Sequence, residues 1–320
     1  MPKSVLLQTI EKVEQNLARL KNCGIGSGGF QPGNSCARGG GGASAVRPVE
    51  AGSYKGGVPH VPSSVFKGKK ANEKGYDTME QYATGINKNG KPTGFTKERQ
   101  ALHDEIIKKH IDQATPVKNP VSYMMGGGPA SGKSTSVDSG HIKLPDNRVE
   151  INADHIKGML PEYKHLTGVK DERAAGFAHE ESSYLSRKII DAAVAKGCNL
   201  NLDGTGDSGI ESLTKKVKQM RTGGRTVKAS YVTLDTNLAV KIEGIRAQKT
   251  GRKVNQGFLR HAHKKVSQIV PDAIKKGLFD EFDLYDNNIK GVSRPVASAK
   301  KGELVIHDKK LWNDFLAKGK

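Results

Sequence analysis

Short apolar runs alternate with longer helical patterns over the second half of the chain. Runs rich in β-branched, aromatic and other apolar side chains predict strands, and they span Val121–Met125, Arg148–Asn152, Asn199–Asp203, Lys228–Leu234 and Phe282–Asp286. The stretches between these runs place apolar residues three and four positions apart, as helices do. Strands and helices that alternate in this way predict an α/β domain in which a mostly parallel sheet is flanked by helices.

Two further helical patterns precede the first predicted strand. Residues 4–21 carry apolar side chains at three- and four-residue steps, and so does the segment Thr96–Gln113. Between them, residues 22–60 contain twelve glycines and residues 61–95 are polar, so this segment buries too little apolar surface to offset its ordering entropy. The sequence therefore predicts an amphipathic helix at 1–21, for packing or for binding a partner, a flexible Gly-rich and basic linker at 22–95, and the α/β domain at 96–320.

A phosphate-binding loop follows the first predicted strand of this domain. The segment from Gly126 to Thr135 reads GGGPASGKST and fits the pattern G-x-x-x-x-G-K-[ST] between a strand and a helix. The residues predicted to contact ATP are Gly127, Gly128, Pro129, Ala130, Ser131, Gly132, Lys133, Ser134 and Thr135. In such loops backbone N–H groups surround the phosphates, the lysine adds a full positive charge, and the hydroxyl after it binds Mg²⁺. ATP and Mg²⁺ are therefore the expected cofactors, although the loop alone does not distinguish a kinase from another ATPase.

Polar residues follow the next two predicted strands where those strands end. Asp154 comes just after the second strand, and Asp203 and Thr205 end the third. Because ligands bind at the carboxyl ends of parallel strands, Asp154 can accept the proton of an attacking hydroxyl, and Asp203 can lie near Mg²⁺ and the substrate. Thr205 would face the group that is phosphorylated. Two local explanations remain open, because Asp154 could cap a helix and the Asp-Gly pair at 203 could serve a turn.

Three more charged residues could contact the substrates. Glu181 lies on the apolar stripe of the helix before the third strand, where a carboxylate requires a partner, so a ligand contact is one interpretation. Arg246 and Arg252 are six positions apart, and paired arginines can neutralise the charge that develops on a transferring phosphate. A solvated basic helix face would explain the two arginines equally well.

Composition limits the classes of partner. The formal net charge is +19, which favours anionic substrates such as nucleotides and leaves nucleic acid as an alternative. Aromatic residues make up 5% of the chain, so stacking platforms for single strands are scarce. No apolar run reaches about 18 residues, so no membrane insertion is expected. Three widely spaced cysteines predict a reduced, cytoplasmic protein without a cysteine zinc site.

The order and spacing of these motifs resemble the zeta toxin family. The resemblance rests on GGPASGKST at 127–135, INADHIK at 151–157, LDGTG at 202–206 and the two spaced arginines, and it covers about residues 119–290. It implies a P-loop kinase that uses ATP and Mg²⁺ to phosphorylate the 3′-hydroxyl of UDP-N-acetylglucosamine, and an inhibitory antitoxin protein that is encoded separately. No such antitoxin module is evident in residues 1–118.

The resemblance also implies roles for individual residues. Lys133 and Ser134 would hold phosphates and metal, Asp154 would be the general base, and Thr205 would contact the substrate. Arg246 and Arg252 would be the two arginines that stabilise the phosphate. The family's substrate-binding glutamate falls on Arg187 here, so either Glu181 replaces it or the sugar nucleotide differs.

Two other functions are compatible with the sequence. One is a nucleic-acid-end kinase, and the other is an interaction protein of a bacteriophage virion that carries a P-loop ATP-binding domain. The basic segment at 67–74 favours the first of these, and the segment at 28–34 suggests the second. A virion-associated location is the corresponding alternative to the cytoplasm.

Overall fold

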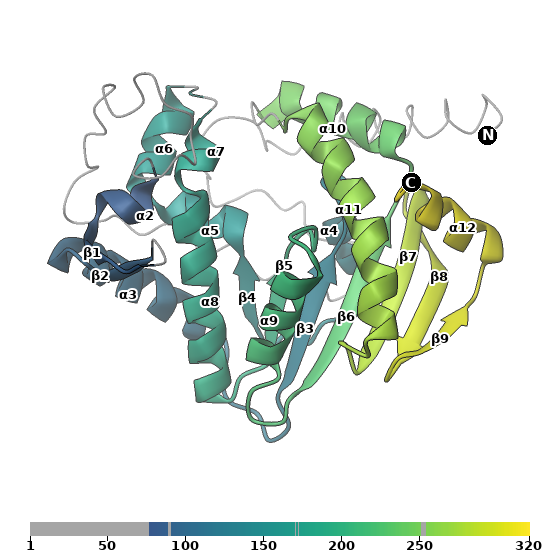
Figure 1. Ribbon diagram of the computed structural model, residues 1–320, viewed down its shortest axis with the longest axis horizontal. Coiled ribbons are helices and arrows are strands. Elements are labelled where there is room, and N and C mark those ends of the chain that lie inside the picture. The colour runs from purple at the N-terminus through teal and green to yellow at the C-terminus, as the bar shows by residue number, and fades with distance from the viewer. Residues whose placement is uncertain (1–76, 89–90, 170, 172, 251–253) are drawn as a thin grey trace, which may run out of the picture.

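The computed structural model describes residues 77–88, 91–169, 171, 173–250 and 254–320. The predicted helix at 1–21 and the linker residues 22–76 lie outside these residues. The described part begins with a small N-terminal unit, followed by a sheet with helices around it (Figure 1). The elements of the N-terminal unit are α2 (Thr78–Gln81), β1 (Ala83–Ile86), β2 (Pro92–Phe95) and α3 (Lys97–Ile111).

Among the described residues, seven strands form the central sheet in the order β4-β5-β3-β6-β7-β8-β9. Their bounds are β3 Val121–Gly126, β4 Val149–Asn152, β5 Leu200–Asp203, β6 Thr226–Thr233, β7 Glu281–Ile289, β8 Val292–Lys300 and β9 Glu303–Ile306. The first five in the spatial order pair in parallel, and β8 and β9 add antiparallel pairs. The sheet is therefore mostly parallel, and the five strands predicted from the sequence are confirmed.

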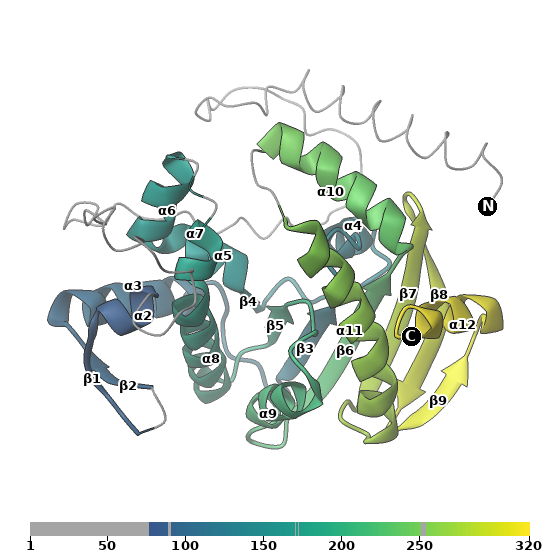
Figure 2. The ribbon, with the colours of Figure 1, turned by 45° about the horizontal axis from the view of Figure 1, so that its top comes forward.

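Helices flank this sheet, as predicted. Their bounds are α4 Lys133–Asp138, α5 Ala153–Met159, α6 Pro161–Gly168, α7 Ala174–Phe177, α8 His179–Lys196, α9 Ile210–Met220, α10 Thr236–Thr250, α11 Gln256–Lys275 and α12 Lys309–Ala317. In Figures 1 and 2, α9 and α11 lie in front of the sheet and α4 lies behind it. The helix predicted at Thr96–Gln113 is confirmed as α3, whose first turn is capped by the Thr96 hydroxyl.

Register in the parallel part of the sheet brings three chain segments together. Asp203 at the end of β5 is the register partner of Met125 in β3 and of Asn152 in β4. The phosphate loop follows β3, and the segment with Asp154 follows β4, so both begin at the same edge of the sheet. Parallel strands place their carboxyl ends together, and this edge is the upper one in Figure 1.

Part of the predicted linker is ordered. Residues 77–95 were expected to belong to a flexible segment, but the described residues 77–88 and 91–95 form α2 and the β1–β2 hairpin. Aromatic contacts hold the hairpin, because the Phe95 ring lies 4.6 Å from the ring of His103 and 5.4 Å from that of Tyr184. The prediction was wrong here because the hairpin is polar and packs through a few aromatic side chains, which give no periodic pattern.

The sequence prediction also lacked the antiparallel strands β8 and β9. β8 contains Pro295 and several alanine, serine and lysine residues, which have low strand propensity. Pairing with β7 forms the strand, and Val296 and Ala297 are buried there. All four residues of β9 are exposed, as is common for a short edge strand.

Candidate active site

The phosphate-binding loop connects β3 directly to α4. Its backbone has positive φ angles at Gly127 (134°), Ala130 (59°) and Gly132 (86°). A Cβ atom at Gly127 would lie 2.3 Å from the carbonyl oxygen of Val232, so a side chain at that position has no room. The Ser131 hydroxyl oxygen is buried and has no hydrogen-bond partner among the described residues. A bound phosphate would satisfy such a donor, so the loop fits the nucleotide predicted from the motif.

A tyrosine of β6 fills the space beneath this loop. Tyr231 is fully buried, and its ring lies where a Cβ at Gly126 or at Gly206 would be placed, at 2.2 and 2.9 Å respectively. The two glycines therefore let the ends of β3 and β5 approach the same ring. Burial raises the pKa of the Tyr231 hydroxyl, so this group stays neutral and is not a proton acceptor.

Two side chains from distant parts of the chain support the loop. The amide nitrogen of Asn287, in β7, donates to the carbonyl oxygens of Ser131 and Gly132, each at 3.2 Å. His263, in α11, contacts the carbonyl oxygen of Pro129 through Nε2 at 2.9 Å. Sequence reasoning missed both supports, because neither residue belongs to a motif and both lie more than 130 positions from their partners.

His263 also explains the glycine at position 128. A Cβ there would lie 2.4 Å from the imidazole ring, so only glycine allows the loop to rest on it. Burial lowers the pKa of His263 to about 4, although the contact with Pro129 opposes this shift. The imidazole is therefore neutral near pH 7 and donates its Nε2 proton to the Pro129 carbonyl.

Lys133 and Asp203 face each other across the mouth of the loop. The Lys133 ammonium donates to the Gly127 carbonyl oxygen at 3.2 Å and lies 3.9 Å from Asp203 Oδ1. Asp203 Oδ2 accepts a hydrogen bond of 2.8 Å from the Asn152 amide, whereas Oδ1 is buried and accepts no hydrogen bond within the described structure. Burial raises the pKa of Asp203, and the charge of Lys133 and the Asn152 hydrogen bond oppose this shift.

These residues also suit a magnesium ion. The Asp203 Oδ1 atom accepts no hydrogen bond from the described residues, and Ser134 is exposed on the first turn of α4. Mg²⁺ binds through oxygen ligands, commonly one or two from the protein with the rest from substrate phosphates and water. The donor set therefore fits a nucleotide-bound magnesium ion, and the assignment of Ser134 and Asp203 to the metal stays a prediction.

Asp154 lies at the neighbouring strand end. Asn152, not Asp154, caps α5, because the Asn152 side-chain oxygen accepts from the backbone nitrogens of Asp154 at 2.8 Å and His155 at 3.4 Å. The alternative in which Asp154 serves as the cap is therefore wrong. The Asp154 side chain is 43% exposed, and its Oδ1 atom lies 3.2 Å from the ammonium of Lys157. A carboxylate in this position can accept a proton from a hydroxyl at the sheet edge.

Thr205 is joined to the phosphate loop by the backbone. Its carbonyl oxygen accepts a 2.9 Å hydrogen bond from the Gly127 nitrogen, and its hydroxyl donates to Asp207 Oδ1. The structure thus brings Thr205 to the same edge as the loop, Asp154 and Asp203.

Glu181 lies in a different environment from the one expected. It is fully buried, and both carboxylate oxygens are bound within the protein, by Arg99 at 2.6 Å twice and by His103 at 2.6 Å. Arg99 also binds Glu162 through two hydrogen bonds, of 2.9 and 3.0 Å. Burial would raise the pKa of Glu181, but the hydrogen bonds from His103 and Arg99 outweigh it and hold the pKa at about 2. The structure therefore does not join Glu181 to the loop, Asp154 and Thr205.

Of the two arginines predicted from the sequence, only Arg246 is among the described residues. Arg246 lies on α10, is 41% exposed and contacts Glu243 Oε2 at 3.5 Å. Arg252 lies outside the described residues, so the predicted clamp of two arginines stays a prediction.

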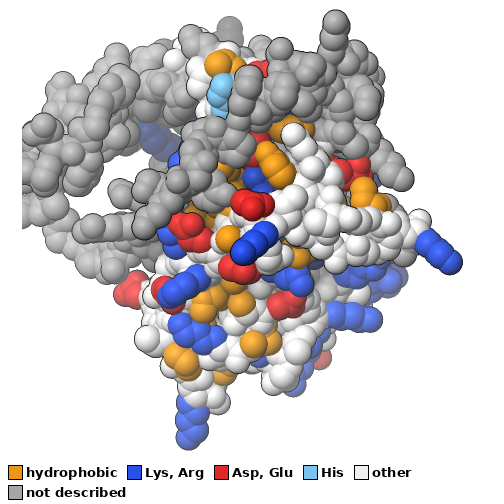
Figure 3. Space-filling view, turned by 90° about the vertical axis from the view of Figure 1, so that its left-hand side faces the viewer, with side chains coloured by type: hydrophobic (Ala, Val, Ile, Leu, Met, Phe, Trp, Pro, Cys, Tyr) orange, Lys and Arg blue, Asp and Glu red, His pale blue; other side chains and the backbone are white. Residues whose placement is uncertain are grey.

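Within the described residues, no helix combines the length and the apolar character that a membrane span requires. Basic side chains are also dispersed on the face shown in Figure 3, where they alternate with acidic and apolar ones.

Comparisons with known proteins agree with this geometry. A sequence profile described as zeta toxin matches residues 104–310, which is more than half of the chain. The Toxin zeta of Streptococcus agalactiae is 25% identical over 118 residues, a match that covers 36% of this chain and 40% of that toxin. The chain thus matches less than half the length of this relative.

Solved structures show the same fold. The complex of AvrRxo1-ORF1 and AvrRxo1-ORF2 with ATP has a TM-score of 0.59 at 17% identity, covering 76% of this chain and 82% of the other. A structure of the PezAT toxin-antitoxin system of Streptococcus pneumoniae has a TM-score of 0.53 at 14% identity, covering 71% and 94%. At these identities the likeness concerns the fold. Together with the profile match and the phosphate loop, it leads to one conclusion: the chain belongs to the zeta toxin family.

Proposed function

We propose that the protein is a kinase that transfers the γ-phosphate of ATP to a hydroxyl of a sugar nucleotide. The observation that carries this proposal is the meeting of three groups at one sheet edge: the phosphate loop with Lys133, the Asp203 carboxylate, whose Oδ1 accepts no hydrogen bond from the described residues, and Asp154. Binding of the nucleotide and Mg²⁺ requires only the first two. Asp154 follows the adjacent strand, and its carboxylate does not cap α5 because Asn152 does. This carboxylate can therefore receive the proton of the acceptor hydroxyl.

The loop residues would hold the nucleotide. Backbone N–H groups between Gly127 and Ser134 and the positive end of α4 would surround the β- and γ-phosphates, and the Lys133 ammonium would neutralise part of their charge. Ser134 and Asp203 would hold Mg²⁺. The metal would supply charge neutralisation on the phosphate oxygens and help to align the γ-phosphate.

The transfer itself requires one proton acceptor. The acceptor hydroxyl loses its proton to the Asp154 carboxylate while its oxygen bonds to the γ-phosphorus, and the bond from that phosphorus to the ADP oxygen breaks. The ammonium of Lys157 lies 3.2 Å from Asp154 Oδ1, so a positive charge stands beside the proposed proton acceptor. Arg246 is the described residue proposed to stabilise charge on the transferring group, with Arg252 as its sequence-predicted companion.

The acceptor we propose is the 3′-hydroxyl of UDP-N-acetylglucosamine, which membership of the zeta toxin family suggests. Thr205 lies beside the loop and is proposed to contact this acceptor. Glu181 has both oxygens bound to Arg99 and His103, so a direct sugar contact would require breaking that buried cluster. We therefore assign Glu181 a structural role and expect other residues to recognise the sugar nucleotide.

The test is transfer from γ-labelled ATP with Mg²⁺ to UDP-N-acetylglucosamine, to other UDP-sugars and to a 5′-hydroxyl oligonucleotide. Lys133→Ala is the blank. Label on UDP-N-acetylglucosamine that disappears in Asp154→Asn supports the proposal. Label on the oligonucleotide alone would establish the nucleic-acid-end kinase instead, and no transfer to any acceptor would contradict kinase activity.

We also infer that a separately encoded protein inhibits the enzyme. The support is that the similar solved structures include a complex with a second protein and a toxin-antitoxin system. If the protein is toxic, induction of the wild type in a bacterial host should arrest growth while Lys133→Ala should not. Equal growth of the two strains would contradict the toxin proposal.

A further inference from the structure

The tail that follows α12, residues 318–320, binds the end of β6. The Lys318 ammonium donates to the Thr233 hydroxyl oxygen and to the Leu234 carbonyl oxygen, each at 2.6 Å. Thr233 is the last residue of β6, and Leu234 follows it on the way to α10. Burial lowers the pKa of Lys318 to about 8, so the side chain still carries its charge at pH 7. A charged donor with little water around it makes stronger hydrogen bonds than an exposed lysine does.

The rest of the tail lies on α11. The Gln268 amide donates to the Gly319 carbonyl oxygen at 2.6 Å, and the Lys264 ammonium donates to the backbone oxygen of Lys320 at 2.7 Å. A Cβ atom at Gly319 would lie 3.2 Å from Ser267 Oγ, so the tail backbone runs close to the helix. The end of the chain marked C accordingly lies beside α11 in Figures 1 and 2. The tail therefore joins α11 to the end of β6.

The end of β6 also forms one wall of the phosphate loop. The carbonyl oxygen of Val232, in this strand, lies 2.3 Å from the position that a Cβ atom of Gly127 would occupy. The side chain of Leu234 belongs to a buried apolar cluster, and Ala130 of the loop packs against that cluster. The residues that surround the loop on this side are therefore the ones next to the acceptors of the tail.

The second partner of the tail, α11, contacts the loop as well. His263 binds the Pro129 carbonyl oxygen at 2.9 Å, and it directly precedes Lys264, which binds the tail. His263 is buried and Lys264 is exposed, so consecutive residues of one helix hold the loop and the tail. The tail thus fixes β6 and α11 relative to each other close to the points where each of them contacts the loop.

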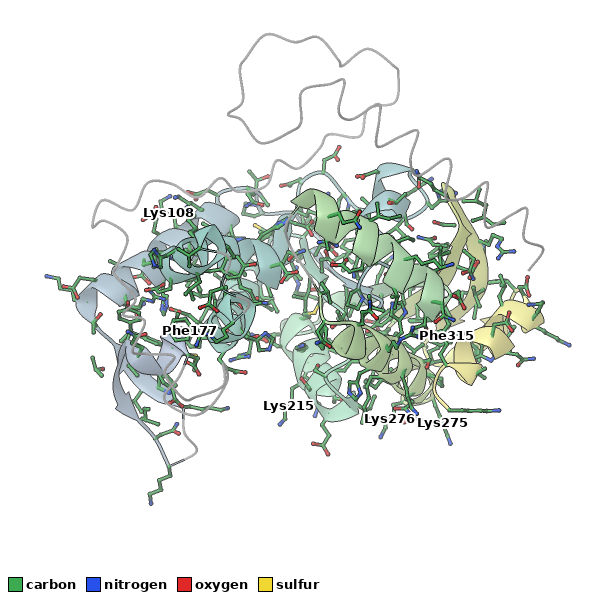
Figure 4. The ribbon with its side chains drawn as sticks, turned by 90° about the horizontal axis from the view of Figure 1, so that it is seen from above. Lys108, Phe177, Lys215, Lys275, Lys276 and Phe315 are labelled. Atoms are coloured by element: carbon green, nitrogen blue, oxygen red, sulfur yellow. The ribbon has the colours of Figure 1, made fainter. Side chains whose placement is uncertain are left out.

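The apolar face of α12 docks this helix independently of the tail. Leu311, Trp312 and Phe315 are each 7% exposed or less and belong to the main hydrophobic core, and Phe315 is labelled in Figure 4. Burial of three large apolar side chains is sufficient to hold a helix of this length on the protein. Removal of the Lys318 charge should therefore leave α12 in place, and the polar bonds of the tail chiefly determine where the end of β6 lies.

We propose that Lys318 is a positioning residue for the phosphate loop. By holding the end of β6 against α11, it keeps Val232 and His263 at the separation at which the loop fits between them and binds nucleotide. Lys318 acts through these two elements and takes no part in the transfer of the phosphate or of the proton. The inference deepens the proposed kinase function and rests on it only for the identity of the nucleotide.

The first test measures binding of a non-hydrolysable ATP analogue, with Mg²⁺, to the full chain. Lys318→Met keeps the apolar stem of the side chain and removes the donor, and we expect it to weaken binding about tenfold because the loop loses a fixed wall. The matched control is Arg221→Met. Arg221 also donates to a carbonyl oxygen and to a side chain, those of Leu278 and Asp280, but at the opposite edge of the sheet. This control should leave the affinity unchanged.

The second test measures backbone hydrogen exchange over residues 126–135 without nucleotide. Exchange there should be faster in Lys318→Met than in the wild type, because the two walls of the loop can separate, and unchanged in Arg221→Met. Unchanged exchange or unchanged affinity in Lys318→Met would overturn the inference, and so would an equal loss of affinity in the control. If the wild type binds no ATP analogue, the proposed function fails, and the exchange measurement alone then decides the role of Lys318.

Discussion

Arg99 and Glu181, 82 positions apart in the sequence, are joined inside the protein by two hydrogen bonds of 2.6 Å. Arg99 is 3% exposed and Glu181 is fully buried. The same guanidinium binds Glu162 of α6, and it lies 4.2 Å from the centre of the Tyr82 ring. One arginine of α3 therefore links the N-terminal unit to α6 and α8.

Replacement of Arg99 by methionine should destabilise the protein strongly, because Glu162 and Glu181 would remain buried without their cation. Loss of one partner from a buried ion pair costs about 3–5 kcal/mol. The control is Lys108→Ala on the same helix, which breaks an exposed pair with Asp112 and should cost less than about 1 kcal/mol (Figure 4). Denaturant unfolding measures both values, and similar losses in the two variants would contradict the assignment.

Acid should unfold the protein through the same cluster. The folded-state pKa of Glu181 is about 2, below its ordinary value of 4.5, so its stabilising contribution is complete above pH 4.5 and is lost as the pH falls toward 2. The shift corresponds to about 3 kcal/mol of unfolding free energy. Glu181→Gln should flatten the pH dependence of stability over this window in urea titrations. An unchanged slope would show that other carboxylates govern acid unfolding.

The proposed active site predicts different defects for its two main residues. Lys133→Met should weaken ATP binding and abolish transfer, because the loop loses its full positive charge. Asp154→Asn should retain ATP affinity within about threefold but lower kcat by about 10²–10⁴, the range that a general base contributes. Nucleotide titration and single-turnover transfer separate the two effects. If Asp154→Asn transferred phosphate at the wild-type rate, the proton acceptor would have to be another group.

Gly128 and His263 should show coupling in a double-mutant cycle. Gly128→Ala places a Cβ against the imidazole ring and should weaken ATP binding at least about tenfold, because the loop must shift. The double variant Gly128→Ala/His263→Ala should bind ATP about as well as His263→Ala alone, since the ring that causes the clash is gone. Gly132→Ala provides the contrast, because its φ of 86° is strained for alanine whatever lies nearby. Additive losses at positions 128 and 263 would contradict this explanation.

Signals confined to one stretch of chain predicted much of the fold and of the site. The phosphate loop needs consecutive residues of defined size and charge, and the strands need short apolar runs, so both can be read from neighbouring positions. The placement of Asp203 beside Lys133 follows from parallel strands whose ends meet. Asp154 was placed at the correct strand end, although the residue that caps α5 is Asn152.

Other features depend on contacts between distant segments. His263 and Asn287 support the loop from α11 and β7, and they look like ordinary polar residues of their own elements. Glu181 is another residue whose partner the sequence could not identify. Its burial on an apolar stripe indicated a partner, but the pattern could not say whether that partner was a ligand or a side chain.

What neighbouring residues specify in this protein is therefore the chemistry of the loop and the alternation that forms the sheet, because those depend on spacing along the chain. The partner of Glu181, the ordered hairpin before α3 and the supports of the phosphate loop depend on which surfaces meet when the chain packs. A buried carboxylate requires a partner that is close in space. For Glu181 that partner is Arg99, which lies 82 residues away in the sequence and is brought beside it by packing of the helices.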